Sequence, residues 1–175
     1  MLPEHIGMRI AATRIVTIRE RVVTFLLVAD LRDEAAHLNA IEERLSVGST
    51  PALHHAALST RLLLQGVADH CFPARSGHWH SQGGGQHKVG PQDTGNRLIA
   101  FVESSLGAEH TSEEHRLFIA LLDTVKRFSG RGPHRIYNPE ESNLYFLRVL
   151  EVMDHIARGY FAQSLRPGMR TSETR

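Results

Sequence analysis

The sequence predicts an all-α protein, an antiparallel bundle of five or six helices with one long loop rich in glycine and histidine. Apolar residues recur at intervals of three and four in each periodic segment, which is the spacing of one helix face. Helix-capping residues stand at the starts of several of these segments. No alternating apolar run requires a strand, and short connections between most segments favour antiparallel neighbours.

The composition is that of an ordinary globular domain. The chain has 175 residues, of which 41% are hydrophobic and 22% charged, so one core can form without disulfides or metals. We assign residues 1–166 to one helical domain and expect a flexible polar tail at 167–175. Twenty Lys and Arg against 19 Asp and Glu leave a net charge of +1. Because this charge creates no global basic field, any site for an anionic partner must be local.

Cysteine usage and hydropathy favour a cytoplasmic protein. Cys71 is the only cysteine, which excludes an intramolecular disulfide and fits a reducing compartment. The most apolar run, VVTFLLVA at 22–29, is bordered by charges and is much shorter than the roughly 18 apolar residues of a membrane span. It also lacks the cleavage pattern of a signal peptide. We therefore expect a buried helix here and no membrane association.

The amino-terminal part is helical up to a clear break. Residues 10–47 keep a helical apolar period that is too long for one typical helix. They form either one long helix of a hairpin or two helices broken near Asp30–Asp33. The VGSTP sequence then ends the pattern, with a glycine after one helix, Ser49 or Thr50 as the cap of the next, and Pro51 in its first position.

The helix after this break is expected to end near Cys71, where the period disappears into a loop at 72–92 that contains three consecutive glycines. A loop of this length in a compact domain is usually functional or disordered. We expect it to be mobile. The helical period resumes in DTGNRLIAFVESSL, with Asp93 or Thr94 as the cap.

Two more helices follow. TSEEHRLFIALLDTVKRF opens with Thr111 and Glu114, the spacing of a capping box. The last helix begins at NPEE, where Asn138 caps and Pro139 takes the first helical position.

The turn between these helices carries a candidate site. RFSGRGPH places Arg127, Arg131 and His134 close together, and an anionic partner would relieve the repulsion among them. An arginine can hold a phosphate through two parallel hydrogen bonds, and an imidazole can transfer a proton near neutral pH. Such a pair suffices for cleaving RNA, whose 2′-hydroxyl attacks its own phosphodiester without a metal. The structural alternative is that Arg127 complements the helix dipole and His134 caps carbonyl groups.

Three blocks of the sequence carry a family resemblance: ALSTRLLLQGVADHCFP, NRLIAFVESSL, and RFSGRGPH ahead of a final capped helix. Together they resemble the bacterial branch of the HEPN superfamily over about residues 50–160. The resemblance implies a helical bundle that commonly dimerises. In many members it also implies a metal-independent ribonuclease of toxin, phage-defence or CRISPR systems. Their motif is an arginine, four to six residues and a histidine, which Arg127 and His134 match.

The resemblance also implies roles for individual residues. Arg127 would hold the scissile phosphate, His134 would transfer the proton and Arg131 would bind the substrate, in a homodimer whose two sites face each other. RNA and a cognate antitoxin or defence protein would be the partners, with no cofactor. Phe128 departs from the polar residue usual after the arginine. The alternative is therefore a non-catalytic module that dimerises or binds a partner protein, in which Arg131 and His134 bind an anion and Arg127 is structural.

The long loop suggests a second alternative, a metal-binding regulator. Cys71, His78, His80 and His87 offer ligands that zinc accepts, but their spacing matches no standard zinc module, so our expectation is that no metal is bound. Trp79 in the same loop either stacks on a base or folds back on its own domain. The chain has no GxxxxGK[ST], GxSxG or HExxH sequence, which leaves P-loop, α/β-hydrolase and zincin chemistry without support.

Overall fold

The computed structural model describes residues 4–81, 85–107, 112–130 and 139–165. Within these ranges the chain forms six helices and one two-stranded sheet, which confirms the all-α class. The elements are α1 (Glu4–Val28), α2 (Arg32–Val47), α3 (Thr50–Cys71), β1 (His78–His80), β2 (Gln86–Lys88), α4 (Thr94–Leu106), α5 (Ser112–Gly130) and α6 (Pro139–Ser164). A membrane span needs a longer apolar stretch than any of these helices contains.

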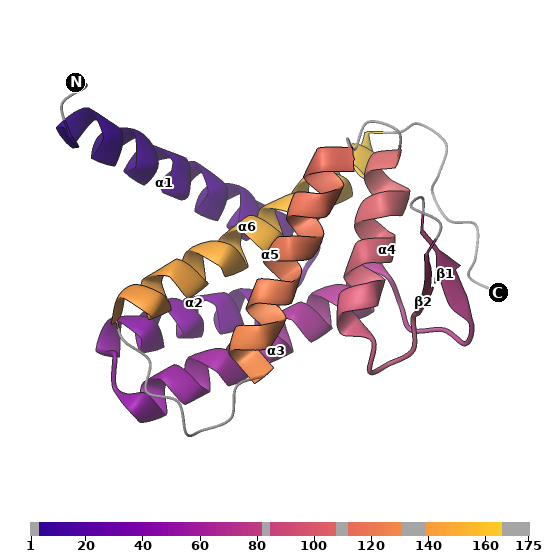
Figure 1. Ribbon diagram of the computed structural model, residues 1–175, viewed down its shortest axis with the longest axis horizontal. Coiled ribbons are helices and arrows are strands. Elements are labelled where there is room, and N and C mark those ends of the chain that lie inside the picture. The colour runs from indigo at the N-terminus through magenta and orange to yellow at the C-terminus, as the bar shows by residue number, and fades with distance from the viewer. Residues whose placement is uncertain (1–3, 82–84, 108–111, 131–138, 166–175) are drawn as a thin grey trace.

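The last helix, α6, is central to the bundle. It packs against α1, α4 and α5, while α2 and α3 pair with each other along their lengths (Figure 1). Val149, Met153 and Ile156 of α6 are completely buried. The first turns of α1 extend beyond the other helices at the upper left of Figure 1. The core therefore forms around the carboxyl-terminal helix, which the other helices surround.

Residues 10–47 form two helices, so the break expected near Asp30 is present. Asp30 has a positive φ of 55°. The N–H of Asp30 donates to the carbonyl of Leu27, and the N–H of Leu31 donates to that of Leu26. This pair of hydrogen bonds is the Schellman ending of a helix, and Asp tolerates the left-handed position better than most residues. Leu31 is buried and holds the turn against the core.

The break after α2 follows the expected helix signals. Gly48 adopts the left-handed conformation with φ 68°, and its N–H donates to the carbonyl of Arg44. Ser49, rather than Thr50, caps α3, because its hydroxyl accepts a hydrogen bond from the N–H of Ala52 at 3.4 Å. Pro51 is the second residue of α3 and not the first, and at either position its missing N–H costs no helix hydrogen bond.

The expectation of a loop without strands at 72–92 is wrong in part. β1 and β2 pair antiparallel, with His78 opposite Lys88, Trp79 opposite His87 and His80 opposite Gln86. Strands of three residues are too short to show the alternation by which strands are recognised. Their position depends on contacts with α4, which the local sequence does not reveal.

The helices start where the sequence predicts, but the expected side-chain capping hydrogen bonds are not always formed. Asp93 precedes α4 as expected, yet its carboxylate makes no hydrogen bond to the helix and instead accepts from the N–H of Gly90 at 3.1 Å. Pro139 is the first residue of α6. The expected caps Thr111 and Asn138, like the tail at 167–175, lie outside the described residues.

Candidate functional site

The predicted site lies at the carboxyl end of α5. Arg127 is exposed in the last turn of this helix, and its Nε donates to the carbonyl of Asp123 at 3.3 Å. Among the residues that the structure describes, no carboxylate pairs with the guanidinium. Arg131 and His134 lie outside the described residues, in the segment 131–138 that joins α5 to α6.

This placement leaves Arg127 able to meet an anion. A guanidinium that is exposed and not engaged by a carboxylate keeps two parallel donors for a phosphate. The carboxyl end of a helix also favours a cation, so the position suits the structural alternative as well. Chemistry by proton transfer requires His134, which follows seven residues later in the chain.

The histidines of the zinc alternative do not converge. Because successive side chains of a strand point to opposite faces, His78 and His80 lie on one face of the hairpin, while His87 shares the other face with Trp79. His78 and His80 are exposed, whereas His87 is half-buried. No group of three or more potential ligands that could hold a metal ion occurs in the described part of the chain.

Cys71 is also a poor metal ligand in this fold. It lies at the end of α3, and burial raises the pKa of its thiol to about 12, because the charged thiolate is desolvated there. Zinc binds the thiolate, so ligation would require deprotonating a group that the fold keeps neutral at physiological pH. The residue therefore behaves as a small, partly buried apolar side chain that packs against the core.

Trp79 folds back on its own domain. Its indole N–H donates to Oε2 of Glu103 in α4 at 2.5 Å, and the hydroxyl of Ser81 donates to Oε1 of the same carboxylate. The Trp79 ring packs edge-on against Phe72, with centroids 5.7 Å apart. Nε2 of His115 in α5 lies 3.3 Å from Oε1 of Glu103. The Glu103 carboxylate, which is only 2% exposed, thus anchors the hairpin to two helices.

This anchor predicts a spectroscopic effect. Glu103→Ala removes the acceptor of two hydrogen bonds and is expected to lower the free energy of unfolding by about 2–3 kcal/mol, since bonds to a buried charge are strong. The fluorescence emission of Trp79, the only tryptophan, should shift to longer wavelength as the ring meets water. Glu113→Ala, at an exposed position of α5, is the control and should leave the emission unchanged. An unshifted spectrum in Glu103→Ala would show that Glu103 does not hold the hairpin.

A buried ion pair between α3 and α4 was not anticipated from the sequence. Arg97 is completely buried, and its Nη1 and Nη2 both donate to Oδ1 of Asp69, at 2.7 and 2.6 Å. The Asp69 side chain is 56% exposed, so water reaches the carboxylate but not the arginine. Asp69 belongs to the block ALSTRLLLQGVADHCFP, and Arg97 belongs to the block NRLIAFVESSL. Their opposite charges were the feature of the sequence from which this ion pair could have been predicted.

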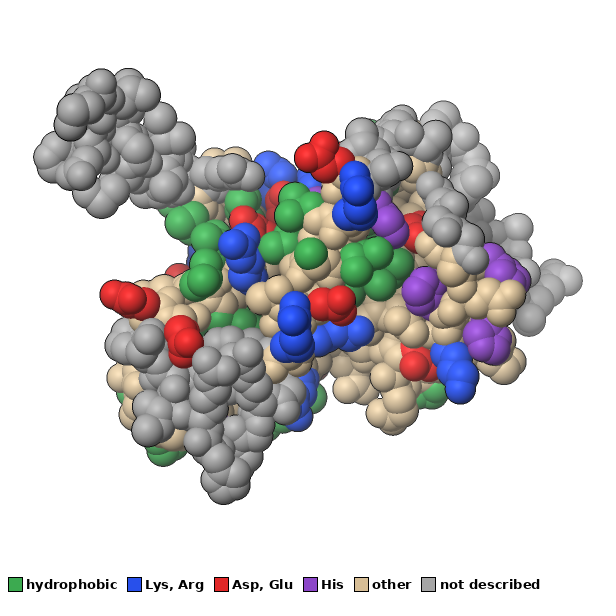
Figure 2. Space-filling view, viewed as in Figure 1, with side chains coloured by type: hydrophobic (Ala, Val, Ile, Leu, Met, Phe, Trp, Pro, Cys, Tyr) green, Lys and Arg blue, Asp and Glu red, His purple; other side chains and the backbone are tan. Residues whose placement is uncertain are grey.

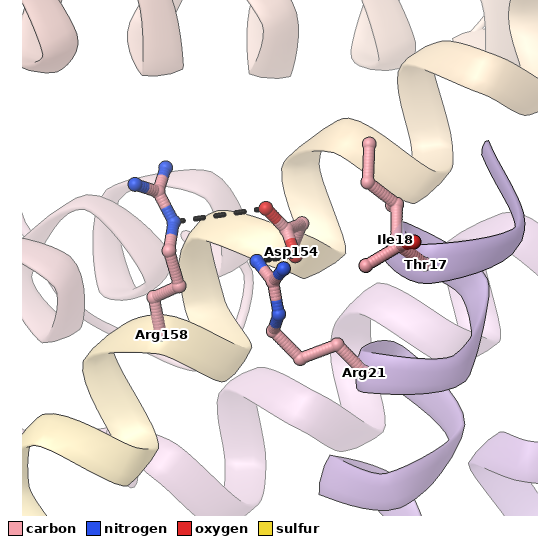
Figure 3. Close-up of a pocket in the computed structure, with 5 residues that line it drawn as sticks. All are labelled: Thr17, Ile18, Arg21, Asp154 and Arg158. Atoms are coloured by element: carbon pink, nitrogen blue, oxygen red, sulfur yellow. Dashed lines mark hydrogen bonds and ion pairs between the residues drawn. The ribbon is translucent and has the colours of Figure 1, made fainter. Parts of the chain in front are cut away.

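A hollow of about 350 Å³ lies between α1 and α6, and Figure 3 shows the five residues that line it. Arg21 of α1 donates to Oδ1 of Asp154 at 2.7 Å, and Nε of Arg158 lies 3.6 Å from Oδ2 of the same carboxylate. Asp154 therefore stands between two arginines and joins α1 to α6. Its single negative charge is shared between the two guanidinium groups.

His155 borders a second hollow, of about 260 Å³, between α5 and α6. It is 6% exposed, and Nη2 of Arg158 donates to its Nδ1 at 2.8 Å, which requires that nitrogen to be unprotonated. Arg158 also lies 3.7 Å from Glu114. The pair resembles an arginine–histidine site, but carboxylates on two helices neutralise the arginine. The sequence feature that could have predicted a buried histidine is the position of His155 near the apolar residues Met153 and Ile156.

Comparison of the chain with protein-family models, with curated proteins and with solved structures found no match.

Proposed function

We propose that this protein is a HEPN-like, metal-independent endoribonuclease that acts as a homodimer in the cytoplasm, as a toxin or anti-phage effector. The observation that carries the proposal is the exposed Arg127 at the end of α5, in a helical bundle, directly ahead of the segment that contains Arg131 and His134. The Asp69–Arg97 ion pair joins two of the resembling blocks, one in α3 and one in α4.

The proposed reaction is an internal transfer at phosphorus. His134 takes the proton of the ribose 2′-hydroxyl, or gives one to the leaving oxygen, while Arg127 stabilises the charge that develops on the phosphate. The bond between the 2′-oxygen and phosphorus forms as the bond to the 5′-oxygen breaks. The products are a 2′,3′-cyclic phosphate and a 5′-hydroxyl end. No redox step or metal is needed.

The direct test is incubation of the purified protein with single-stranded RNA in EDTA. We expect cleavage with cyclic phosphate ends, because neither proton transfer nor arginine stabilisation uses a metal. Light scattering at micromolar concentration should give a dimer, since Arg127 and His134 supply few groups and two copies double the donors around one phosphate. Intact RNA, or cleavage only with added metal, would reject the ribonuclease. A strict monomer would reject the composite site.

The second candidate is a non-catalytic module that binds a partner protein or a second copy. It is favoured by Leu117 of α5, an apolar residue that lines the hollow between α5 and α6 and is 52% exposed. Apolar side chains next to charged rims are typical of protein interfaces. Suppose that the Leu117→Glu variant no longer associates with a partner protein or a second copy, and that the folded wild type does not cleave RNA. These two results together would favour the binding module over the ribonuclease.

A further inference from the structure

The β1–β2 hairpin presents two histidines on the face that points away from the helices. Trp79, between them in the chain, donates its indole N–H to Glu103 of α4 and so lies on the inner face. Because successive side chains of a strand point to opposite faces, His78 and His80 lie together on the outer face, where both are exposed. Figure 2 shows histidine side chains at the surface on the right of the molecule, where Figure 1 places the hairpin.

The imidazoles of His78 and His80 can reach one metal ion. Alternate residues of a strand are roughly 6.5–7 Å apart, and their side chains stand nearly parallel. The two rings can therefore turn toward a point between them, at the length of a metal–nitrogen bond, about 2.0–2.1 Å. Neither ring makes a hydrogen bond or an ion pair with another residue that the structure describes, so their nitrogen atoms remain available as ligands.

The hairpin that carries this pair is fixed to the bundle through both strands. The hydrogen bond from Trp79 to Glu103 holds β1. On the other strand, Nδ2 of Asn96 in α4 donates to the carbonyl of Lys88 at 2.9 Å, and the next residue, Val89, is completely buried. Ligands on a fixed strand lose less conformational entropy on binding than ligands on a mobile loop. The hairpin therefore holds the two histidines in place before a metal ion arrives.

Two further residues share the outer face. Gln86 lies opposite His80, Lys88 lies opposite His78, and both are exposed. The amide oxygen of Gln86 is an additional ligand that a site with nitrogen and oxygen ligands accepts. The ammonium group of Lys88 instead repels a cation. A metal ion should therefore lie toward the end of the face that carries His80.

We propose that His78 and His80 form a surface site for a divalent transition-metal ion, which binds Cu²⁺ most tightly and completes its coordination with water or Gln86. Imidazole suits Cu²⁺, Ni²⁺ and Zn²⁺, and Cu²⁺ forms the strongest complexes of this series. The inference goes beyond the proposed ribonuclease, which needs no metal. It also revises the expectation, drawn from spacing, that the loop binds no metal. With Cys71 and His87 excluded as ligands, the strand register still leaves two histidines on one face.

The fluorescence of Trp79 provides the test. It is the only tryptophan and lies one residue from both ligands, so Cu²⁺ bound here should quench its emission, whereas ions on distant histidines should not. Titration of Cu²⁺ into the full-length protein should give quenching that saturates at one ion per chain. His78→Ala and His80→Ala should each need about tenfold more Cu²⁺ for half-saturation, since one of two protein ligands is lost. His87→Ala is the matched control on the inner face and should be quenched as the wild type is.

Electron paramagnetic resonance identifies the ligands directly. The wild type loaded with Cu²⁺ should show coupling to two imidazole nitrogens, and His78→Ala and His80→Ala should each show one at most. Quenching of the wild type that does not saturate, or equal half-saturation for the wild type and these two variants, would overturn the inference. So would an equal loss of affinity in His87→Ala, because the ion would then lie on the inner face. RNA cleavage is measured in EDTA and does not enter this test, so this inference and the proposed ribonuclease can fail independently.

Discussion

Replacing His134 by alanine is expected to lower the rate of RNA cleavage by about 10²–10⁴-fold, the usual contribution of a general acid or base. Arg127→Ala should lose activity to a similar degree, because the guanidinium would stabilise charge that is greatest in the transition state. Both effects should appear in kcat, measured with labelled single-stranded RNA in EDTA. Arg131→Ala should instead raise KM more than it lowers kcat, since that residue is assigned to substrate binding.

Thermal melts provide the control for these variants. Arg127 is exposed, and its hydrogen bond to Asp123 lies within its own helix, so Arg127→Ala should leave the melting temperature nearly unchanged. His134→Ala should also melt like the wild type if the residue lies in an exposed turn. Should His134→Ala unfold the domain, His134 is a structural residue, and the proposed role of RFSGRGPH is wrong.

Asp69→Ala is expected to cost about 3 kcal/mol of the free energy of unfolding, because it leaves the charge of Arg97 buried without a partner. For a chain of this size that corresponds to a fall of roughly 10 °C in melting temperature. Arg97→Met should cost much less, about 1 kcal/mol, since methionine fills similar space and the remaining Asp69 is solvated. Chemical denaturation of the two variants measures both costs.

The double variant Asp69→Ala with Arg97→Met is the matched control. It removes both charges, so it should be more stable than Asp69→Ala alone. Equal costs for the two single variants would show that burial of the arginine charge is not what makes the pair important. Because this pair lies between α3 and α4, the result also tests whether the two resembling blocks have a structural purpose.

Local signals in the sequence predicted most of the helices. The break at Asp30, the glycine at Gly48 and the serine cap at Ser49 each determine backbone conformation over one turn. Pro139 likewise marks the start of α6. Such signals act within a few residues and need no distant partner, so they can be read directly. Asp93 shows their limit, because its carboxylate bonds Gly90 rather than the helix it precedes.

The hairpin at 78–88 could not be predicted from neighbouring residues alone, because it depends on contacts with residues far away in the sequence. Its strands are three residues long, and Trp79 and Ser81 are held by Glu103, which lies more than 20 residues later in the chain. The same is true of the histidines. Spacing alone allowed His78, His80 and His87 to share a metal, whereas the antiparallel register separates them onto two faces.

The sequence by itself determined the fold class and most of the helix boundaries, because periodicity and capping are local properties of the chain. Only the tertiary structure decided which charges are paired. It buried Arg97 against Asp69, joined Arg21 to Asp154 and placed Glu114 beside Arg158. Those partners come from different helices, and their meeting depends on how the helices pack, which is set by the whole core at once.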